Sequence, residues 1–526
     1  MSKRGSIFWG LTVLALVWST RAGAAPRWLR LSWTQDPSQS ITVSWTDGPG
    51  TGSAEIQLPD NSTRSVDAVT VDTGSSELET TYTVTFTGLE PDTAYRYRVQ
   101  SGGQWSDWYD ARTGPAPGSC SAFTFVMGGD SRGEELLGHY RQVQWPAIVG
   151  LIAAENPLFM LHSGDYVRSG GDDSQWAAEL DVLPELSQSH SFFVTLGNHD
   201  TGPGRGESSW YDMVFAYPND NPDSVEDYYT FVTGNLQVVC LSTETYDMDA
   251  QIAWLDQVLT AHESQVDWKV VFFHRPVWSS GEHGSNEDDK PRAEILLPVL
   301  EAHHVDIVLN GHDHDYERFH PSLGGYGTPR QINPLPDDNG RRGVANGVVY
   351  IVSGGAGALV NPIFSQTIEG SAFGSNHLHY IVAQVAGSTM TLTVRDLGSQ
   401  GFSDPSIQGE LETVVLEKSG GLCGGSHPDG GTDAGVDAGW DGGTDGGTAL
   451  DGQGQPDDSA TAADGGLQAD GNSGLDSGEG GSGTAKSGCN CRNAGGTPTL
   501  PVLFALILCL TRLRFRKKAR SRTVPR

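Results

Sequence analysis

The sequence predicts an all-β sandwich followed by a layered α/β domain of the α-β-β-α type, and then a disordered tail with a short hydrophobic segment. Three observations support this division. Short runs of alternating apolar and polar residues fill positions 26–115, as in strands with one buried face. Strand-like and helix-like runs alternate over 120–417, which is typical of a layered α/β domain. Over 418–488 large apolar side chains become rare, so this part cannot build a core.

The chain is strongly acidic. Its 526 residues include 65 Asp and Glu against 33 Lys and Arg, which gives a formal net charge of −32. Such a charge opposes non-specific binding to nucleic acid or to an anionic membrane, so we expect no nucleic acid among the partners. The charge is unevenly distributed, because residues 421–487 contain one basic residue, Lys486, whereas the last fifteen residues are basic.

The N-terminus has the features of a secretory signal peptide over residues 1–25. Lys3 and Arg4 precede an apolar run at 7–18, and Ala22-Gly23-Ala24 is a small-residue pattern that signal peptidase accepts. The apolar run is short for a membrane span. We therefore expect the mature chain to be exported.

Residues 26–115 are expected to form a small antiparallel sandwich without helices. Runs such as 41–45 and 82–86 alternate apolar and polar residues, with turn residues between them. The segment 89–95 resembles the corner of a fibronectin type III domain, in which the hydroxyl of a tyrosine, here Tyr95, ties down the turn. Trp33 and Trp45 are expected in the core, because they lie on alternating strands.

The second domain, at 120–417, is expected to alternate strands with helices. Strands are predicted at 123–127, 158–162, 192–196, 236–241, 269–273 and 305–309, and helices within 140–154, 174–186, 249–262 and 293–303. Three further strands are predicted at 348–352, 380–385 and 389–394. Sheets of this kind bind ligands at the carboxyl ends of their strands, so chemistry is expected there.

Five of these strand ends carry side chains that can bind a metal. In chain order they are Asp130, Asp165, Asn198 with His199, His274, and the pair His312 and His314. A lone His-x-His pair is as often a surface feature as a metal site, but the four upstream ends favour the metal site. The mixed oxygen and nitrogen donors suit Fe, Zn or Mn. Because they are too many for one tetrahedral ion, we expect two ions bridged by a carboxylate.

These residues resemble the calcineurin-like metallophosphoesterase superfamily. The full string at 311–318, Gly-His-Asp-His-Asp-Tyr-Glu-Arg, and the fibronectin-like domain before it resemble the purple acid phosphatase branch. The resemblance implies that Asp130, Asp165 and His314 hold the first metal. It also implies that Asp165 bridges to a second metal held by Asn198, His274 and His312, and that a metal-bound hydroxide attacks phosphorus.

The same resemblance implies roles for three further residues. His199 would bind phosphate and protonate the leaving group, with Asp200 orienting its ring; alternatively, His199 is only a hydrogen-bonded neighbour of the site. His283 lies in a loop where similar enzymes have a substrate-contacting histidine; alternatively, it is an exposed loop residue.

Two positions depart from the family pattern. Purple acid phosphatases have an iron-binding tyrosine three residues after the second aspartate, and here that residue is Arg168. Tyr166 is not expected to replace it, because its direction differs. Other members have a histidine two residues after the first aspartate, where this chain has Arg132. We expect the enzyme not to be purple, and Arg132 or Arg168 to contact the substrate phosphate; alternatively, both arginines form surface salt bridges.

Three of the six cysteines lie in or beside the predicted second domain. Cys120 precedes its first strand and Cys423 follows its last, so a disulfide could close it, although unpaired thiols fit equally well. Cys240, inside a predicted strand, is expected to be a small buried residue.

The tail has two parts. Residues 418–488 are rich in Gly and Asp and are expected to form a flexible, self-repelling stalk. In 489–526, Cys489-Asn-Cys491, an apolar run at 500–510 and a basic cluster resemble the C-terminal sorting tags of myxobacterial surface proteins; a plain transmembrane anchor is the alternative. Either way we expect the protein at the cell surface or outer membrane, or released from it.

The sequence thus predicts a binuclear metallophosphatase that hydrolyses phosphate monoesters outside the cytoplasm, with a small phosphorylated substrate and two metal ions as cofactors. A phosphodiesterase or pyrophosphatase on the same site is an alternative, because the ligands are shared. An adhesin with a vestigial metal site is a second alternative, but the complete ligand set argues against it.

Overall fold

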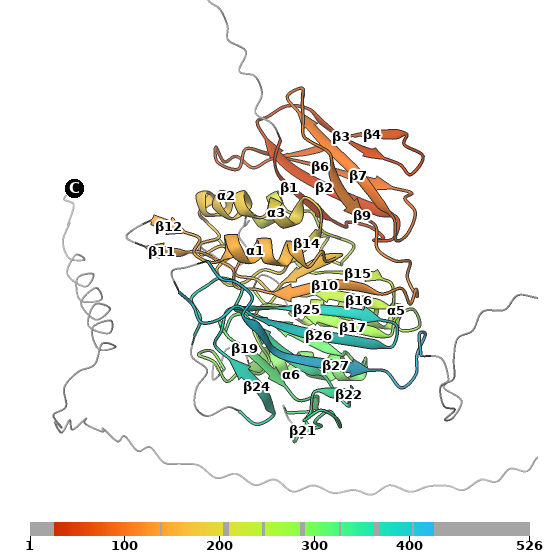
Figure 1. Ribbon diagram of the computed structural model, residues 1–526, viewed down its shortest axis with the longest axis vertical. Coiled ribbons are helices and arrows are strands. Elements are labelled where there is room, and N and C mark those ends of the chain that lie inside the picture. Colours follow the sequence, from red (N-terminus) through yellow and green to blue (C-terminus); the bar gives the residue numbers. More distant parts are fainter. Residues whose placement is uncertain are drawn as a thin grey trace, which may run out of the picture. The chain divides into compact units, whose positions relative to one another are not determined.

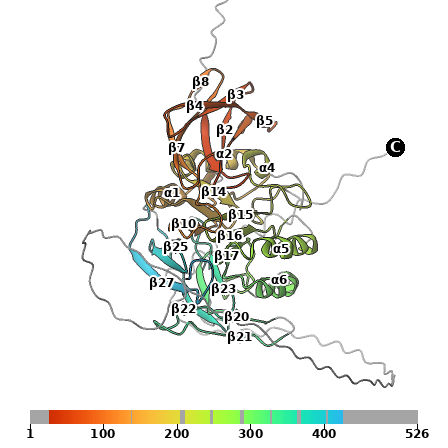
Figure 2. The same ribbon diagram turned by 90° about the vertical axis from the view of Figure 1, so that its right-hand side faces the viewer.

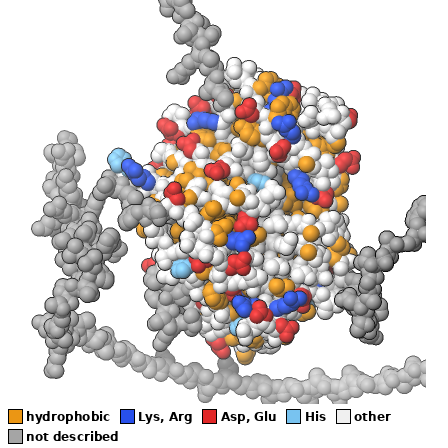
Figure 3. Space-filling model, viewed as in Figure 1, with side chains coloured by type: hydrophobic (Ala, Val, Ile, Leu, Met, Phe, Trp, Pro, Cys, Tyr) orange, Lys and Arg blue, Asp and Glu red, His pale blue; other side chains and the backbone are white. Residues whose placement is uncertain are grey.

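The computed structural model describes residues 26–136, 139–202, 210–244, 248–284, 290–325, 328–361, 368–401 and 404–424 (Figure 1). The expected signal peptide, the stalk beyond residue 424 and the C-terminal segment lie outside these residues. Within the described part of the chain, no helix is both long and apolar enough to cross a membrane. On the face in Figure 3, Lys and Arg side chains are scattered among Asp and Glu.

The N-terminal domain is a sandwich of two antiparallel sheets. One sheet contains β1 (Arg27–Ser32), β2 (Ser40–Asp47), β6 (Thr80–Thr87) and β5 (Val69–Asp72), and the other contains β4 (Thr63–Asp67), β3 (Gly52–Gln57), β7 (Ala94–Ser101), β8 (Gln104–Trp105) and β9 (Tyr109–Arg112). Trp45 stacks on Tyr82 between the sheets, with ring centroids 5.4 Å apart. The Tyr95 hydroxyl accepts a hydrogen bond from the Glu90 amide at 2.8 Å, which is the expected corner.

The sandwich shares a sheet with the second domain. β1 pairs in parallel with β14 (Ser191–Val194), so one sheet runs through both domains in the order β22-β27-β26-β25-β10-β13-β14-β1-β2-β6-β5. Trp33 is buried, as expected, but it packs in the second domain against Phe159, Phe193 and Phe231, with centroids 5.5–5.7 Å away. The two domains therefore share both a sheet and a core.

The other strands and helices of the second domain build four layers. The second-domain part of the shared sheet adds β10 (Phe123–Gly128), β13 (Phe159–His162), β25 (His379–Ala386), β26 (Thr389–Asp396), β27 (Gly409–Glu417) and β22 (Arg342–Val344). The second sheet contains β15 (Tyr229–Thr233), β16 (Leu236–Cys240), β17 (Trp268–Phe272), β18 (Ile307–Asn310), β23 (Val349–Ser353), β19 (Tyr316–Phe319) and β24 (Ser371–Ser375). Short hairpins and one short helix complete the domain: β11 (Glu134–Leu136), β12 (His139–Arg141), β20 (Ser322–Leu323), β21 (Gln331–Ile332) and α4 (Tyr211–Val214).

Helices cover the outer faces of the two sheets. α1 (Trp145–Ala154), α2 (Asp173–Val182) and α3 (Pro184–Ser187) pack on the shared sheet, whereas α5 (Met248–His262) and α6 (Lys290–Ala302) pack on the second sheet (Figures 1 and 2). In β17, Val270 faces the core between the sheets and Val271 faces the helices. Because both faces of the central strands are buried, their sequences read as continuous apolar runs.

The structure also decides between the alternatives for the cysteines. Cys120 and Cys423 form a disulfide with Cα atoms 5.6 Å apart, and Cys240 is a buried free thiol. Near this bond, beyond β27, the amides of Leu422 and Cys423 both donate to the carboxylate of Asp267. The disulfide therefore ties the last described residues to the start of the second domain.

Candidate metal centre

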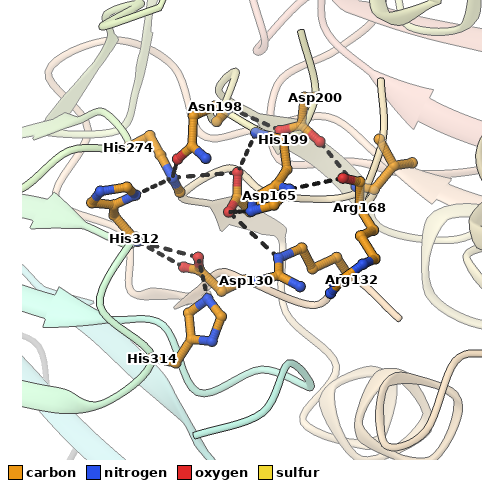
Figure 4. A network of polar contacts seen from close by, with 12 residues as sticks. Asp130, Arg132, Asp165, Arg168, Asn198, His199, Asp200, His274, His312 and His314 are labelled. Carbon is orange, nitrogen blue, oxygen red and sulfur yellow. Dashed lines mark hydrogen bonds and ion pairs between the residues drawn. The ribbon is translucent and has the colours of Figure 1, made fainter. Parts of the chain in front are cut away.

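The polar strand ends predicted from the sequence meet at one place (Figure 4). β10, β13 and β14 run in parallel, as do β17 and β18 in the second sheet, so their carboxyl ends lie at the same edge. Asp130 follows β10, Asp165 follows β13, Asn198 and His199 follow β14, His274 follows β17, and His312 and His314 follow β18. The structure thus brings together all six residues expected to bind metal.

One group of donors surrounds the His274 ring. Its Nε2 atom lies 3.3 Å from Asp165 Oδ1, 3.0 Å from Asn198 Oδ1 and 3.2 Å from His312 Nδ1. Its Nδ1 atom lies 2.9 Å from the Ser163 carbonyl oxygen, so the ring proton belongs there and Nε2 presents a lone pair. A lone pair facing two acceptor oxygens is unfavourable, so a cation belongs between them, either a proton on Nε2 or a metal ion that displaces it. The ring and its neighbours therefore fit a bound metal ion.

A second group lies around Asp130. Its Oδ1 atom is 3.4 Å from His314 Nε2, and His314 Nδ1 is fixed by the Leu359 carbonyl oxygen at 2.7 Å. Donor atoms of Asp130, Asp165 and His274 lie within 4.8 Å of one another. Asp165 is thus placed between the two groups, as a bridging carboxylate requires. Burial lowers the pKa of His274, but the nearby Asp165 and Asp130 carboxylates outweigh it and raise the pKa above its ordinary value.

The backbone at these strand ends is strained. Asp130, Asp165 and His312 have φ values of 58°, 53° and 71°, in the left-handed region that costs a non-glycine residue about 1–3 kcal/mol. The preceding glycines mainly allow close approach. A Cβ on Gly197 would lie 2.2 Å from Asp165 Oδ1, and one on Gly311 would lie 2.2 Å from Asp130 Oδ2. Such strain is common where a fold positions functional groups.

His199 lies beside this centre, but Asp200 does not orient its ring as expected. The His199 Nδ1 atom is 2.7 Å from the carbonyl oxygen of Arg168, which leaves Nε2 facing Asp165 Oδ2 at 3.9 Å. The Asp200 carboxylate instead accepts the amides of Val167 at 2.9 Å and Gly197 at 2.8 Å. Burial raises the pKa of Asp200 to about 7. Asp200 therefore supports two backbone loops of the site rather than the imidazole.

His283 lies beside His312 and is held by Asp313. Both the amide and the Nδ1 atom of His283 bond to Asp313 Oδ1, at 2.9 and 2.8 Å, and Ser279 donates to Oδ2 at 2.5 Å. The imidazole lies with its centroid 4.0 Å from that of His312. The hydrogen bond to Asp313 raises the pKa of His283. Asp313 was not predicted as a site residue, although its place between His312 and His314 could have indicated it.

Both arginines line the pocket, and each is paired with Glu134. Arg132 Nη1 is 3.0 Å from Glu134 Oε1, and Arg132 Nε is 3.6 Å from Asp165 Oδ2. Arg168 Nη1 pairs with Glu134 Oε2. These residues, with His199, His283 and several metal-ligand candidates, line a pocket of about 300 Å³. The arginines thus form salt bridges inside the pocket, so the two alternatives considered from the sequence are not exclusive.

Tyr166 lies away from the pocket. It is fully buried, and its ring packs against Trp176, Phe192 and Phe215 at centroid distances of 5.8–6.0 Å. Burial raises the pKa of its hydroxyl well above the ordinary value, and that oxygen has no hydrogen-bond partner among the described residues. In this position it cannot serve as the iron-binding tyrosine that the purple enzymes have at the place of Arg168.

The second half of the string at 311–318 is structural. Glu317 accepts hydrogen bonds from the amide and hydroxyl of Ser280, both at 2.6 Å, and from Ser371 at 2.5 Å. Arg318 forms a two-bond ion pair with Glu412 on β27 at 2.8 and 2.9 Å. These contacts fix the strand that follows His314 and the loop that carries His283.

Comparison with known proteins agrees with this geometry. Residues 136–316 match the calcineurin-like phosphoesterase family, a segment that contains every candidate ligand except Asp130. The chain is therefore a metallophosphoesterase, a hydrolase of the phosphoesterase type. Residues 26–113 match the purple acid phosphatase N-terminal domain, so the chain combines that domain with a calcineurin-like phosphoesterase domain.

The chain is also similar to several proteins and, in its fold, to a solved structure. An uncharacterized protein of Mycobacterium tuberculosis is 27% identical over 378 residues, covering 64% of this chain and 70% of that protein. Purple acid phosphatase 18 of Arabidopsis thaliana is 28% identical over 244 residues, covering 44% of this chain and 51% of that protein. The fold is similar to purple acid phosphatase PPD1 from yellow lupin seeds, with a TM-score of 0.64, 20% identity, and coverage of 75% of this chain and 74% of that one.

Proposed function

We propose that this protein hydrolyses phosphate monoesters, releases inorganic phosphate, and uses two metal ions drawn from Fe, Zn or Mn. The observation that carries the proposal is the convergence of Asp165 Oδ1, Asn198 Oδ1 and His312 Nδ1 on His274 Nε2, beside the Asp130 and His314 pair. Backbone carbonyl groups fix the donor rings, since Ser163 O bonds to His274 Nδ1 and Leu359 O bonds to His314 Nδ1. Metal-binding histidines are commonly oriented in this way.

Asp130, Asp165 and His314 would hold the first ion, and Asp165 with Asn198, His274 and His312 would hold the second. The ions, when bound, would supply an activated water as nucleophile and would withdraw charge from the phosphate. The first group has one protein ligand fewer than the second, because Arg132 and Arg168 stand where other members have a histidine or a tyrosine. We therefore keep the prediction that the enzyme is not purple.

The chain's own residues would bind and orient the ester. Arg132 and Arg168 line the pocket with charged donors suited to phosphate oxygens. His199 has its Nδ1 atom fixed by the Arg168 carbonyl, and His283 has its Nδ1 atom fixed by Asp313, so both present Nε2 on the open side. Donation of a proton from Nε2 to the leaving oxygen requires the doubly protonated ring. Burial disfavours that form for His199 by lowering its pKa, whereas the hydrogen bond to Asp313 favours it for His283 by raising its pKa. Two guanidinium groups with one Glu134 carboxylate between them leave a net positive charge, which favours a dianionic monoester over a singly charged diester.

A phosphodiesterase or pyrophosphatase activity is a second candidate. It is supported by a relative from Hordeum vulgare named as a nucleotide pyrophosphatase/phosphodiesterase, which is 24% identical over 283 residues. The adhesin alternative is disfavoured, because every ligand expected from the sequence is present and placed at the centre.

Export and attachment at the cell surface also form part of the proposal. They rest on residues 1–25 and 489–526, which lie outside the described residues. The disulfide between Cys120 and Cys423 supports export, since such bonds persist mainly in oxidising compartments.

The test is hydrolysis of p-nitrophenyl phosphate and bis-p-nitrophenyl phosphate by the purified protein, with and without added Fe, Zn or Mn. We expect metal-dependent release of nitrophenol, faster from the monoester. Asn198→Ala and His312→Ala should lower the rate more than about 100-fold, because each removes a metal ligand. Asn346→Ala, at an exposed position in a surface loop, is the matched control and should hydrolyse the esters at the rate of the parent protein. No turnover of either ester by the metal-loaded protein would refute the proposal.

A further inference from the structure

Glu134 forms salt bridges with both arginines that line the pocket. Its two carboxylate oxygens face different guanidinium groups, Oε1 that of Arg132 and Oε2 that of Arg168. The Glu134 and Arg132 side chains are 12% and 10% exposed, so this pair is largely shielded from water, while Arg168 is 35% exposed. Glu134 lies in the pocket wall together with Asp165, Asn198 and His312. The Glu134 carboxylate is therefore paired with the guanidinium groups that line the pocket beside the candidate metal centre.

The hairpin that carries Glu134 is anchored from behind. Glu179 on α2, which is fully buried, accepts hydrogen bonds from the Tyr140 hydroxyl and from Gln142 Nε2 at 2.7 Å. The Gly133 amide donates to the Tyr140 oxygen at 2.8 Å and to Glu179 at 3.3 Å. Because Gly133 directly precedes Glu134, these contacts fix the backbone from which the carboxylate reaches the arginines. The contact is thus built into the fold.

A carboxylate and a phosphate use the same guanidinium donors. Both accept paired N–H···O bonds from arginine, so an anion entering the pocket competes with Glu134 for Arg132 and Arg168. The Glu134 charge also repels an incoming phosphate at short range, in surroundings where water screens it poorly. Arg132 Nε has no hydrogen-bond partner among the described residues and faces Asp165, so one donor remains unused while Glu134 is in place.

We propose that Glu134 is an internal competitor for the substrate phosphate, which weakens phosphate binding and so favours release of the product. This inference rests on the proposed function, because it requires Arg132 and Arg168 to face the phosphate. Glu134 would then be a residue that sets affinity for phosphate, in addition to the groups that hold the metals.

The test compares Glu134→Gln with Glu135→Gln in the full-length, metal-loaded protein. Glu135 is the exposed neighbour on the same strand, so its substitution changes the net charge equally without touching the arginines. Binding of inorganic phosphate is measured by titration calorimetry, and metal content by elemental analysis. We expect Glu134→Gln to bind phosphate about tenfold more tightly, with unchanged metal content, and Glu135→Gln to stay within about twofold of the parent.

A second variant covers the case in which Glu134→Gln folds poorly. Glu134→Asp keeps the charge but is one methylene too short to span both arginines, and it should give a smaller gain. Adding Arg168→Ala to Glu134→Gln should remove most of the gain, because the two side chains act through one contact. Weaker or unchanged phosphate binding in Glu134→Gln would overturn the inference and make Glu134 a positioning residue for the arginines.

Calorimetry also separates this inference from the proposed function. Phosphate binding is measured without turnover, so a protein that hydrolyses no ester but binds phosphate more tightly as Glu134→Gln would refute the function alone. An active enzyme whose phosphate affinity does not respond to Glu134 would refute the inference alone.

Discussion

Replacing Glu412 by alanine should destabilise the protein severely, although this residue lies outside the pocket. The Arg318 and Glu412 side chains are 2% and 1% exposed, and two hydrogen bonds join them at 2.8 and 2.9 Å. The Tyr316 hydroxyl donates to the same carboxylate at 2.7 Å. Glu412→Ala would leave a guanidinium group buried in the protein without its counter-ion.

The size of the effect follows from this burial. Breaking a buried ion pair by removing one partner costs about 3–5 kcal/mol, because the remaining charge stays desolvated. The lost acceptor of Tyr316 would by itself cost about 1–3 kcal/mol, but it shares an oxygen with Arg318, so the two losses should not add fully. We expect a total loss of about 3–5 kcal/mol in the free energy of unfolding. Arg318→Met with Glu412→Leu should lose less, because no buried charge remains.

Urea unfolding followed by tryptophan fluorescence measures this loss, with the disulfide intact. Glu410→Ala is the matched control, since Glu410 lies on the same strand and pairs with Arg395 at 3.0 Å while 50% exposed. Exposed pairs contribute about 0–1 kcal/mol, so the control should unfold close to the parent. If Glu412→Ala cost no more than Glu410→Ala, a structural role for the end of the string at 311–318 would be refuted.

Three further predictions concern the site and the disulfide. Asp313→Asn should lower the pKa of His283, because the hydrogen bond between the two side chains is what raises it. The His283 ring then loses its proton at lower pH, so the alkaline limb of the pH–rate profile for an alkyl phosphate should move to lower pH. The iron-loaded protein should show no visible tyrosinate band, because Tyr166 is buried in an aromatic cluster; a purple colour on iron loading would contradict this. Reducing the disulfide between Cys120 and Cys423 should cost about 2–5 kcal/mol, measured as a lower urea midpoint, and an unchanged midpoint would argue against it.

The positions of the candidate ligands could be predicted because each one follows a strand with a clear pattern. In parallel sheets the carboxyl ends of strands meet at one edge, so Asp130 and His274 were expected to converge although they are far apart in the sequence. The fold of the second domain followed from the same runs. β19 was not predicted, because its charged residues Glu317 and Arg318 conceal a fully buried strand.

Contacts between distant side chains could not be predicted. Glu134 lies in a stretch where no strand or helix was predicted from the sequence, and only the fold brings it between Arg132 and Arg168. Asp200 was expected to orient His199, but both of its oxygens are used by backbone amides. In each case the sequence gives the residue, whereas the partner of its side chain depends on tertiary packing.

The pairing of β1 with β14 means that the N-terminal sandwich cannot be regarded as a removable module. A second domain produced alone would present β14 as an open edge, with unpaired backbone groups that invite pairing between molecules. It would also lack Trp33, whose indole packs among Phe159 and Phe193, and would have a hollow in its core. We therefore expect the second domain produced without the N-terminal sandwich to aggregate, so that the two domains must be expressed as one unit.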